Sequence, residues 1–201
     1  MQSEATGWAR ITVQPVASTI ALTPAEPHIA HKCLPTIRFF VYLCVTLGKS
    51  CDQNSGKPLK EMTINEIQDE IIEEFGGFDD WMDRYSYIIE LGNAMPALEE
   101  RHKTADNLIE GCQSRVWIVA SLVDGLVVFQ ADSDALIVRG IISLLLRCLS
   151  RQTPQDILDA DLYFIGKVGL QEHLSPTRSN GLVSMVKQMR MYALAYKAKG
   201  A

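Results

Sequence analysis

The feature that most constrains the fold is a hairpin signal in the middle of the chain. The pair Asp124-Gly125 stands between two apolar runs, Arg115–Val123 and Leu126–Ala131. An Asp-Gly pair favours the type I′ turn that joins two antiparallel strands. A shorter run, Asn107–Glu110, precedes them and predicts a further strand beside the hairpin. The sequence therefore predicts a three-stranded antiparallel sheet.

Helical patterns precede these strands. Thr63 and Glu66 have the spacing of a capping box at the start of an amphipathic run, and Gly76-Gly77 is expected to end that helix. Asp79-Asp80 then suits the positive end of a second helix, which we expect to stop at Gly92. Two helices thus come before the sheet.

Helical patterns also follow the strands. A strongly apolar helix is predicted from about Asp134 to Leu149, with Asp132 or Ser133 as its cap, and its composition indicates burial. Thr153-Pro154 begins a short helix, and a last helix is expected from about Asn180 to Lys197. This order predicts a compact α+β single domain with the sheet packed against helices, and not a parallel βαβ repeat.

The first 61 residues differ from the rest. Prolines at positions 15, 24, 27, 35 and 58 interrupt them, and no helical or strand period is sustained. We interpret residues 1–61 as an irregular leader: a disordered segment, a targeting peptide or an over-extended start. The last is favoured because Met62 directly precedes a well-formed helix start. The folded domain is then 62–201.

Charge and hydropathy restrict the partners. Residues 1–60 carry six Lys and Arg against three Asp and Glu, whereas 61–201 carry 13 against 21, a net charge of −8. An acidic domain repels phosphate backbones, which argues against nucleic acid as a partner. No run of 18 or more apolar residues occurs, so no membrane span is predicted.

Five cysteines, an odd number with no CxxC pair, argue against a disulfide scaffold and for a reducing cytosol. Cys112 lies next to Gly111 at a bend between two predicted strands, where a thiol can be exposed or swing. Arg115 is near enough in sequence to favour the thiolate by its charge. The alternative is that Cys112 is a small buried hydrophobe. Cys148, on the apolar stripe of its helix, is interpreted as core.

Other chemistries have weaker support. His28, His31 and Cys33 lie in the leader and lack a fourth ligand, so we predict no metal site. A cysteine–histidine pair would need His102 or His173 beside Cys112, and the sequence places neither of them there.

Four ordered motifs identify a family. The run from Gly111 to Trp117 resembles the Gly-Cys-Gln-Ser-x-Val-Trp signature of SufE-type sulfur acceptors. Leu91-Gly92 with Met95-Pro96, Ser133-Asp134-Ala135 with Arg139-Gly140, and the block Leu174–Leu182 resemble further segments of that family, in the same order. Together they span about Thr63 to Lys199. The segment 1–61 has no counterpart in the family pattern.

The resemblance implies an α+β fold related to IscU-type scaffold proteins, and Cys112 as the acceptor of persulfide sulfur. It implies a cysteine desulfurase of the SufS or CsdA kind as donor and the SufB–SufC–SufD complex as recipient. Pyridoxal phosphate belongs to the desulfurase, so no tightly bound cofactor is expected here. Gly111, Gln113, Ser114 and Arg115 would support the thiol. Arg178 would dock the partner, support the thiolate by its charge, or bond to nearby backbone or carboxylate groups near the start of its helix.

Two other functions stay open. One is a non-catalytic adapter that activates a desulfurase by docking, as in the CsdE branch, and the other is a scaffold for a nascent cluster, which usually needs several thiolates. We expect a cytoplasmic protein, or a plastid or mitochondrial one if residues 1–61 act as a transit peptide. The oligomeric state is open, with a homodimer as one option.

Overall fold

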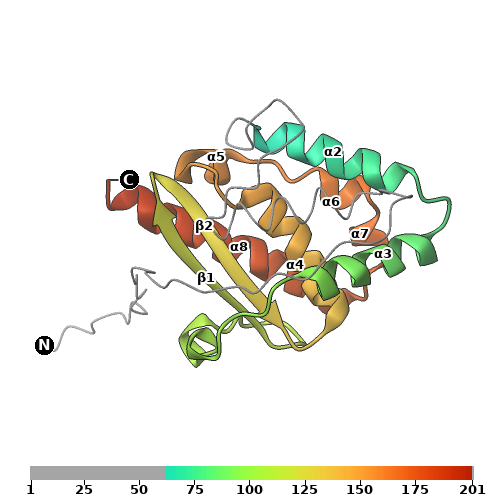
Figure 1. The fold of residues 1–201 in the computed structure, drawn as a ribbon, viewed down its shortest axis with the longest axis horizontal. Coiled ribbons are helices and arrows are strands. Elements are labelled where there is room, and N and C mark those ends of the chain that lie inside the picture. Colours follow the sequence, from blue (N-terminus) through green and yellow to red (C-terminus); the bar gives the residue numbers. More distant parts are fainter. Residues whose placement is uncertain (1–61, 201) are drawn as a thin grey trace, which may run out of the picture.

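The computed structural model describes residues 62–200, which form a mixed α+β domain (Figure 1). The elements follow in the order α2 (Ile64–Gly76), α3 (Trp81–Ala94), the 3₁₀ turns η2 (Glu100–His102) and η3 (Ala105–Asn107), β1 (Val116–Val123), β2 (Leu126–Ser133), α4 (Leu136–Leu149), α5 (Pro154–Asp159), α6 (Phe164–Lys167), α7 (Leu170–His173) and α8 (Pro176–Ala198). The predicted leader, residues 1–61, lies outside the described residues.

Local capping signals determine where two helices begin. At α2 the Thr63 hydroxyl accepts a hydrogen bond from the Glu66 amide, and the Glu66 carboxylate accepts one from the Thr63 amide at 2.8 Å. This is the predicted capping box, and it satisfies two of the donors that a helix start leaves unpaired. At α5 the Thr153 hydroxyl accepts from the Asp156 amide, and Pro154 occupies the first turn. Both predicted starts are confirmed.

The hairpin is confirmed in its position and turn. β1 and β2 pair antiparallel in a register that runs from Val123 opposite Leu126 to Val116 opposite Ser133. Asp124 and Gly125 both have positive φ, 54° and 77°, as the two central residues of a type I′ turn require.

The predicted third strand is wrong, because the sheet of the described residues has two strands. Asn107 ends the turn η3, and only Leu108 makes a bridge, opposite Trp117. The Ile109 amide donates to the Val116 carbonyl at 2.8 Å, and the chain then turns away at Gly111. One bridge at the end of β1 is therefore all that this run contributes.

Side chains of α8 cover the rest of that edge of β1. The Tyr192 hydroxyl donates to the Ile118 carbonyl at 3.1 Å, and the Tyr196 hydroxyl donates to the Ala120 carbonyl at 2.8 Å. A free strand edge leaves backbone groups unpaired and invites further strands. The two tyrosines satisfy those carbonyls, so α8 takes the place where a third strand would extend the sheet.

The helix α4 lies in the centre and packs against α2, α3 and β2, while α8 packs against α5 and β1 (Figure 1). Most of α4 is buried, as its composition predicted, and Cys148 has no exposed surface. The predicted start of α4 is two residues early: the helix begins at Leu136, without a side-chain cap. The last helix begins earlier than predicted, at Pro176.

Gly92 does not end its helix, contrary to the prediction. It is buried inside α3, where a Cβ atom would lie 2.8 Å from the Gly140 amide nitrogen of α4. A Cβ atom on Gly140 would overlap the backbone of Ile88 in α3. The two glycines therefore let α3 and α4 pack backbone against backbone.

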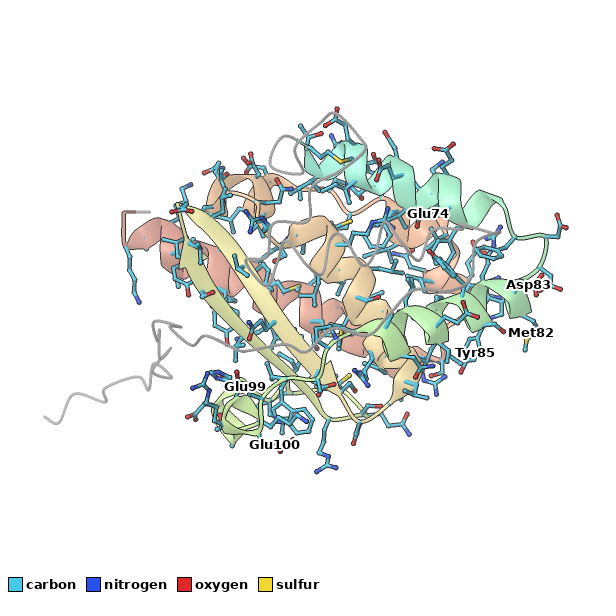
Figure 2. All side chains as sticks on the ribbon, viewed as in Figure 1. Glu74, Met82, Asp83, Tyr85, Glu99 and Glu100 are labelled. Carbon is cyan, nitrogen blue, oxygen red and sulfur yellow. The ribbon has the colours of Figure 1, made fainter. Side chains whose placement is uncertain are left out.

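A buried ion pair joins α2 to α4. Both terminal nitrogens of Arg147, a side chain only 3% exposed, lie 2.6 Å from the Glu74 carboxylate oxygens. Glu74 points from α2 toward α3 in Figure 2, and its carboxylate also accepts from the Tyr87 hydroxyl at 3.3 Å. Three helices are thus tied together around one carboxylate.

Candidate functional site

Cys112 lies on a loop whose two ends are joined by a backbone hydrogen bond. The hydrogen bond from the Ile109 amide to the Val116 carbonyl joins the two ends, and the segment 110–115 projects between them. Gly111 has φ of 81°, a left-handed conformation that other residues rarely adopt, so the chain can reverse just before the cysteine. The predicted placement of the thiol at a glycine-flanked bend is confirmed.

The loop rests on the first turns of α8. The Thr177 hydroxyl donates to the Gln113 side-chain oxygen at 3.1 Å. Gly181 is buried against the Cys112 side chain, and Ser184 lies beneath Gly111. Cys112 is half-buried and packs at the edge of the hydrophobic core. The thiol is therefore sheltered but not sealed in.

The surroundings of Cys112 favour the neutral thiol. Burial is the main cause that raises its pKa, and the negative charge of Asp134 raises it further. Hydrogen bonds from the backbone amides of Ser114 and Gln113 act in the opposite direction and lower the pKa. The net shift is upward, because loss of water disfavours the charged form more than two amide donors stabilise it.

Arg115 does not supply the predicted positive charge to the thiolate. Its Nε and its backbone amide each donate to the Asp134 carboxylate at 3.0 Å, and its guanidinium lies 5.6 Å from the ring centroid of Trp117. Asp134 was predicted as the first residue of the helix, but α4 begins at Leu136. It holds the end of the cysteine loop instead, and this contact joins residues 19 positions apart, so no local pattern shows it.

Asp132 was predicted as a possible cap of α4, but that helix has no side-chain cap and Asp132 has a different role. It is buried, accepts from the Leu98 amide at 3.2 Å, and lies 3.2 Å from both Lys103 Nζ and Arg139 Nε. Two cations thus balance one buried carboxylate, as a buried charge requires. Asp132 fixes the segment that leads from α3 to the cysteine loop, and Lys103 also lies 5.9 Å from the Trp117 ring centroid.

Arg178 lies on the first turn of α8, one helical turn before Gly181, and its side chain is exposed. Within the part of the chain that the structure describes, Arg178 makes no hydrogen bond and no ion pair. The prediction left open whether this arginine bonds to nearby groups, and the described residues offer it no such bond.

The second described cysteine, Cys148, is expected to be unreactive. Cys148 is fully buried in α4, and burial raises the pKa of its thiol to about 12. The remaining cysteines, at positions 33, 44 and 51, lie in the leader, as does the pair His28 and His31, and all are outside the described residues.

Neither of the two described histidines forms a pair with the Cys112 thiol. His102 accepts from Arg101 in the turn η2, and the ring of His173 stacks on Trp81 with centroids 4.2 Å apart. Neither is among the groups that shift the pKa of Cys112.

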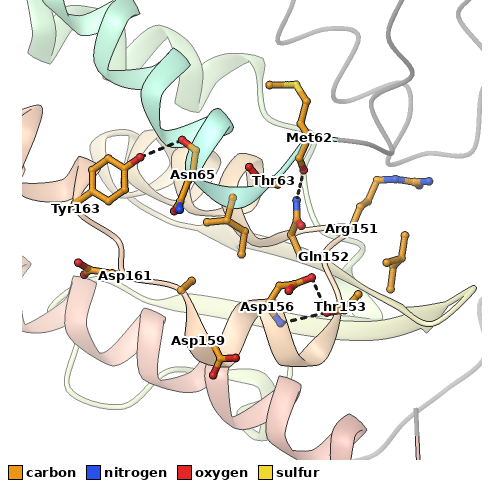
Figure 3. A pocket seen from close by; sticks show the side chains of 13 residues that line it. Met62, Thr63, Asn65, Arg151, Gln152, Thr153, Asp156, Asp159, Asp161 and Tyr163 are labelled. Atoms are coloured by element: carbon orange, nitrogen blue, oxygen red, sulfur yellow. Dashed lines mark hydrogen bonds between the residues drawn. The ribbon is translucent and has the colours of Figure 1, made fainter.

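A separate hollow of about 620 Å³ opens between the start of α2, the segment before α5 and the segment after it (Figure 3). Met62, Gln152 and Tyr163 are among its lining residues, and no residue of the cysteine loop is.

Among residues 62–200, no group of three or more His, Cys, Asp and Glu is arranged to hold a metal ion. No helix in the same residues is both long and apolar enough to span a bilayer.

Comparison with known proteins agrees with the motifs. The family model described as "SufE: Fe-S metabolism associated domain" matches residues 69–193. An uncharacterized SufE-like protein of Rhizobium meliloti is 42% identical over 130 residues, which cover 62% of this chain and 93% of that protein. A second one, from Rhizobium etli, is 45% identical over 127 residues, covering 61% and 86%.

The fold also has a solved counterpart. The solution structure of a hypothetical protein from Thermus thermophilus superposes with a TM-score of 0.56 at 19% identity, over 66% of this chain and 96% of that one. This likeness supports the α+β fold alone. The family match covers more than half of the chain and includes Cys112, the hairpin and most of α8. This protein therefore belongs to the SufE family of Fe–S metabolism associated domains.

Proposed function

We propose that this protein is a sulfur carrier that accepts persulfide sulfur from a cysteine desulfurase on Cys112 and delivers it to an Fe–S cluster assembly complex such as SufB–SufC–SufD. The observation that carries the proposal is the position of Cys112. Of the two described cysteines it alone has exposed surface, and it lies on a projecting loop within the family's Gly-Cys-Gln-Ser motif.

The transfer step is a thiol–disulfide exchange in form. The Cys112 thiolate attacks the outer sulfur of the donor persulfide, a new sulfur–sulfur bond forms, and the bond to the donor cysteine breaks. The donor cysteine leaves as a thiolate. The proton that Cys112 gave up on ionisation can then protonate this thiolate, so charge and protons balance. One sulfur atom moves and no external oxidant or reductant is consumed.

The resting pose of Cys112 is suited to storage more than to attack. Its raised pKa keeps the sulfur mostly as a thiol, and the contact with α8 limits access by small reductants. Attack then requires the sulfur to leave its contact with Gly181 and turn toward water, where the thiolate is better solvated. Opening of the loop would expose the sulfur further, and it would break the exposed hydrogen bond between Thr177 and Gln113.

Arg178 provides a docking group beside this loop. It is exposed and without an ion pair in the described residues, and it lies one turn from the glycine that contacts Cys112. We expect it to meet a carboxylate of the desulfurase, because an arginine that is unpaired in the free protein gains most when a partner supplies the anion.

The adapter function remains the alternative, in which the same face docks onto a desulfurase and Cys112 receives nothing. The half-buried thiol with its raised pKa is the observation that favours it, since a protein that only docks needs no reactive sulfur.

Intact-mass spectrometry separates the two functions. The full chain is mixed with a cysteine desulfurase and cysteine, and the carrier function predicts a gain of about 32 mass units that dithiothreitol removes. A Cys112→Ser variant should gain no mass and lose the acceleration of cysteine turnover, whereas Cys148→Ala should behave as wild type. A Cys112→Ser variant that accelerates turnover normally, with no mass gain in the wild type, would establish the adapter.

A further inference from the structure

The cysteine loop and α8 meet along one face of the helix. Thr177, Gly181 and Ser184 are four and three residues apart, so they share a side of α8. The loop runs past them in the opposite direction: Gln113 bonds to Thr177, Cys112 contacts Gly181, and Gly111 lies over Ser184, whose hydroxyl oxygen would be 3.3 Å from a Cβ atom on that glycine. Three successive loop residues thus lie against three small residues of α8.

The middle contact is the closest of the three. A Cβ atom on Gly181 would overlap the Cys112 sulfur, and it would lie 3.6 Å and 3.8 Å from the Cβ and Cα atoms of the same cysteine. Apart from the adjacent residues and the backbone of α8 itself, the three atoms nearest to it all belong to Cys112. The sulfur therefore occupies the volume that a side chain at position 181 would fill.

The presence of glycine at position 181 needs a structural explanation. It lies inside the long helix α8, where glycine is destabilising relative to alanine. Its backbone is an ordinary helix with negative φ, so no turn or left-handed conformation requires glycine there. The contact with Cys112 is the requirement that the structure shows.

We propose that Gly181 is a positioning residue for sulfur transfer: the missing side chain forms the recess that holds the Cys112 sulfur in its sheltered pose. This inference rests on the proposed function only for the link between the recess and sulfur transfer. Its physical content, that position 181 controls the exposure of the Cys112 sulfur, holds or fails by itself.

The recess differs from a fixed packing contact, because the sulfur is the free end of a side chain. A methyl group at position 181 needs no movement of α8; rotation of the cysteine about its Cα–Cβ bond is enough to remove the overlap. We expect this rotation to turn the sulfur toward water, because the Cys112 side chain is only half-buried. Because burial is the main cause that raises the pKa of Cys112, the pKa should then fall toward its ordinary value.

Alkylation by iodoacetamide at several pH values tests the recess directly. The tryptic peptide from Thr104 to Arg115 contains Cys112 and no other cysteine, so its labelling is read separately from that of the other thiols. For Gly181→Ala we expect the rate at neutral pH to rise at least about threefold and the midpoint of the profile to shift to lower pH, since each pKa unit changes the thiolate fraction about tenfold.

The matched control is Gly166→Ala, a helical glycine of α6 whose added Cβ atom would have only the Gln171 side-chain oxygen, at 3.9 Å, in reach. It should leave both the rate and the midpoint of Cys112 labelling unchanged. A Gly181→Ala protein that is folded and labels at the wild-type rate and midpoint would overturn the proposal.

A stability cycle covers the case in which Gly181→Ala folds poorly. Removing the sulfur with Cys112→Ala should cancel the penalty, so that Gly181→Ala in this background is at least as stable as Cys112→Ala alone in urea. An equal loss of stability with and without the Cys112 thiol would show that the methyl group collides with something else, and the proposal would fall.

The two proposals fail in different ways. If wild-type protein gains no sulfur from a desulfurase while Gly181→Ala still alters alkylation, the recess stands and the carrier function falls. If sulfur reaches Cys112 but alkylation does not respond to position 181, the carrier function stands and the recess falls.

Discussion

Glycine allows close packing in two regions of this molecule, with different consequences. Between α3 and α4, Gly92 and Gly140 bring backbone against backbone, and neither side can move without moving a whole helix. Between the cysteine loop and α8, Gly181 meets the end of one side chain. The contact between α3 and α4 can open only if the helices separate, whereas the contact between Cys112 and Gly181 can be broken by rotation about one side-chain bond.

The two described cysteines lie in these two regions. Cys148 is on α4, deep in the rigid part, and Cys112 is on the loop that rests on α8. The reactivity of a thiol in this protein therefore depends on which of the two contacts surrounds it.

The largest effect is expected at the rigid contact. Gly140→Ala places a methyl group in the backbone of Ile88, so α3 and α4 must separate. We expect a loss of at least about 4 kcal/mol in the free energy of unfolding, or no folded protein, because overpacking against backbone has no side chain that can yield. Urea denaturation measures it. Gly76→Ala, with nothing within 4 Å of the added atom, is the control, and equal stability of the two variants would contradict the rigid contact.

The next effect is expected at the ion pair in the same region. Glu74→Ala removes the carboxylate that contacts both terminal nitrogens of Arg147, whose side chain is 3% exposed. A loss of about 3 kcal/mol is expected, because a buried charge loses its main partner. Thermal and urea unfolding report it. Glu73→Ala, an exposed neighbour on α2, should cost much less, and a similar loss for both variants would argue against the buried pair.

A smaller effect separates the two thiols. In the native protein at pH 8, Cys112 should be alkylated at least about tenfold faster than Cys148, because exposure and thiolate fraction both favour it. The rate at Cys112 should rise with pH through a midpoint above the ordinary thiol value, since burial raises its pKa. Peptide mapping after a timed pulse measures both. Equal rates in folded protein would remove the distinction between the two regions.

The smallest effect is expected at the loop end. Asp134→Asn keeps an oxygen for the Arg115 amide but removes the negative charge that raises the pKa of Cys112. We expect Cys112 alkylation at neutral pH to rise about twofold, with stability changed by less than about 1 kcal/mol, because the ion pair is exposed. Glu99→Gln, which breaks the similarly exposed pair with Arg101, should leave the rate unchanged. A slower reaction in Asp134→Asn would contradict the assigned sign.

Features set by neighbours in sequence were predictable. The helix starts at Thr63 and Thr153 and the turn at Asp124-Gly125 depend on residues within four positions of one another, and all three were predicted correctly. The position of Cys112 at a bend beside Gly111 belongs to the same class, because one glycine with positive φ determines it.

Features set by distant contacts were not predictable from one sequence. Gly92 has the pattern of a helix end, but Gly140, 48 residues later, explains it. The run before Gly111 has the pattern of a strand, but tyrosines of α8 occupy the edge it would need. The neutralising contact of Arg115 with Asp134 likewise depends on how the hairpin brings their two ends together.

The most direct test of the carrier function follows one sulfur atom to one residue. The desulfurase is loaded with a single equivalent of ³⁵S-cysteine, mixed with this protein, quenched without reductant and digested with trypsin. The carrier function predicts label on the peptide from Thr104 to Arg115, released by dithiothreitol and absent from the Cys112→Ser variant. Label that stays on the desulfurase, or that appears on any other peptide of this chain, would contradict it.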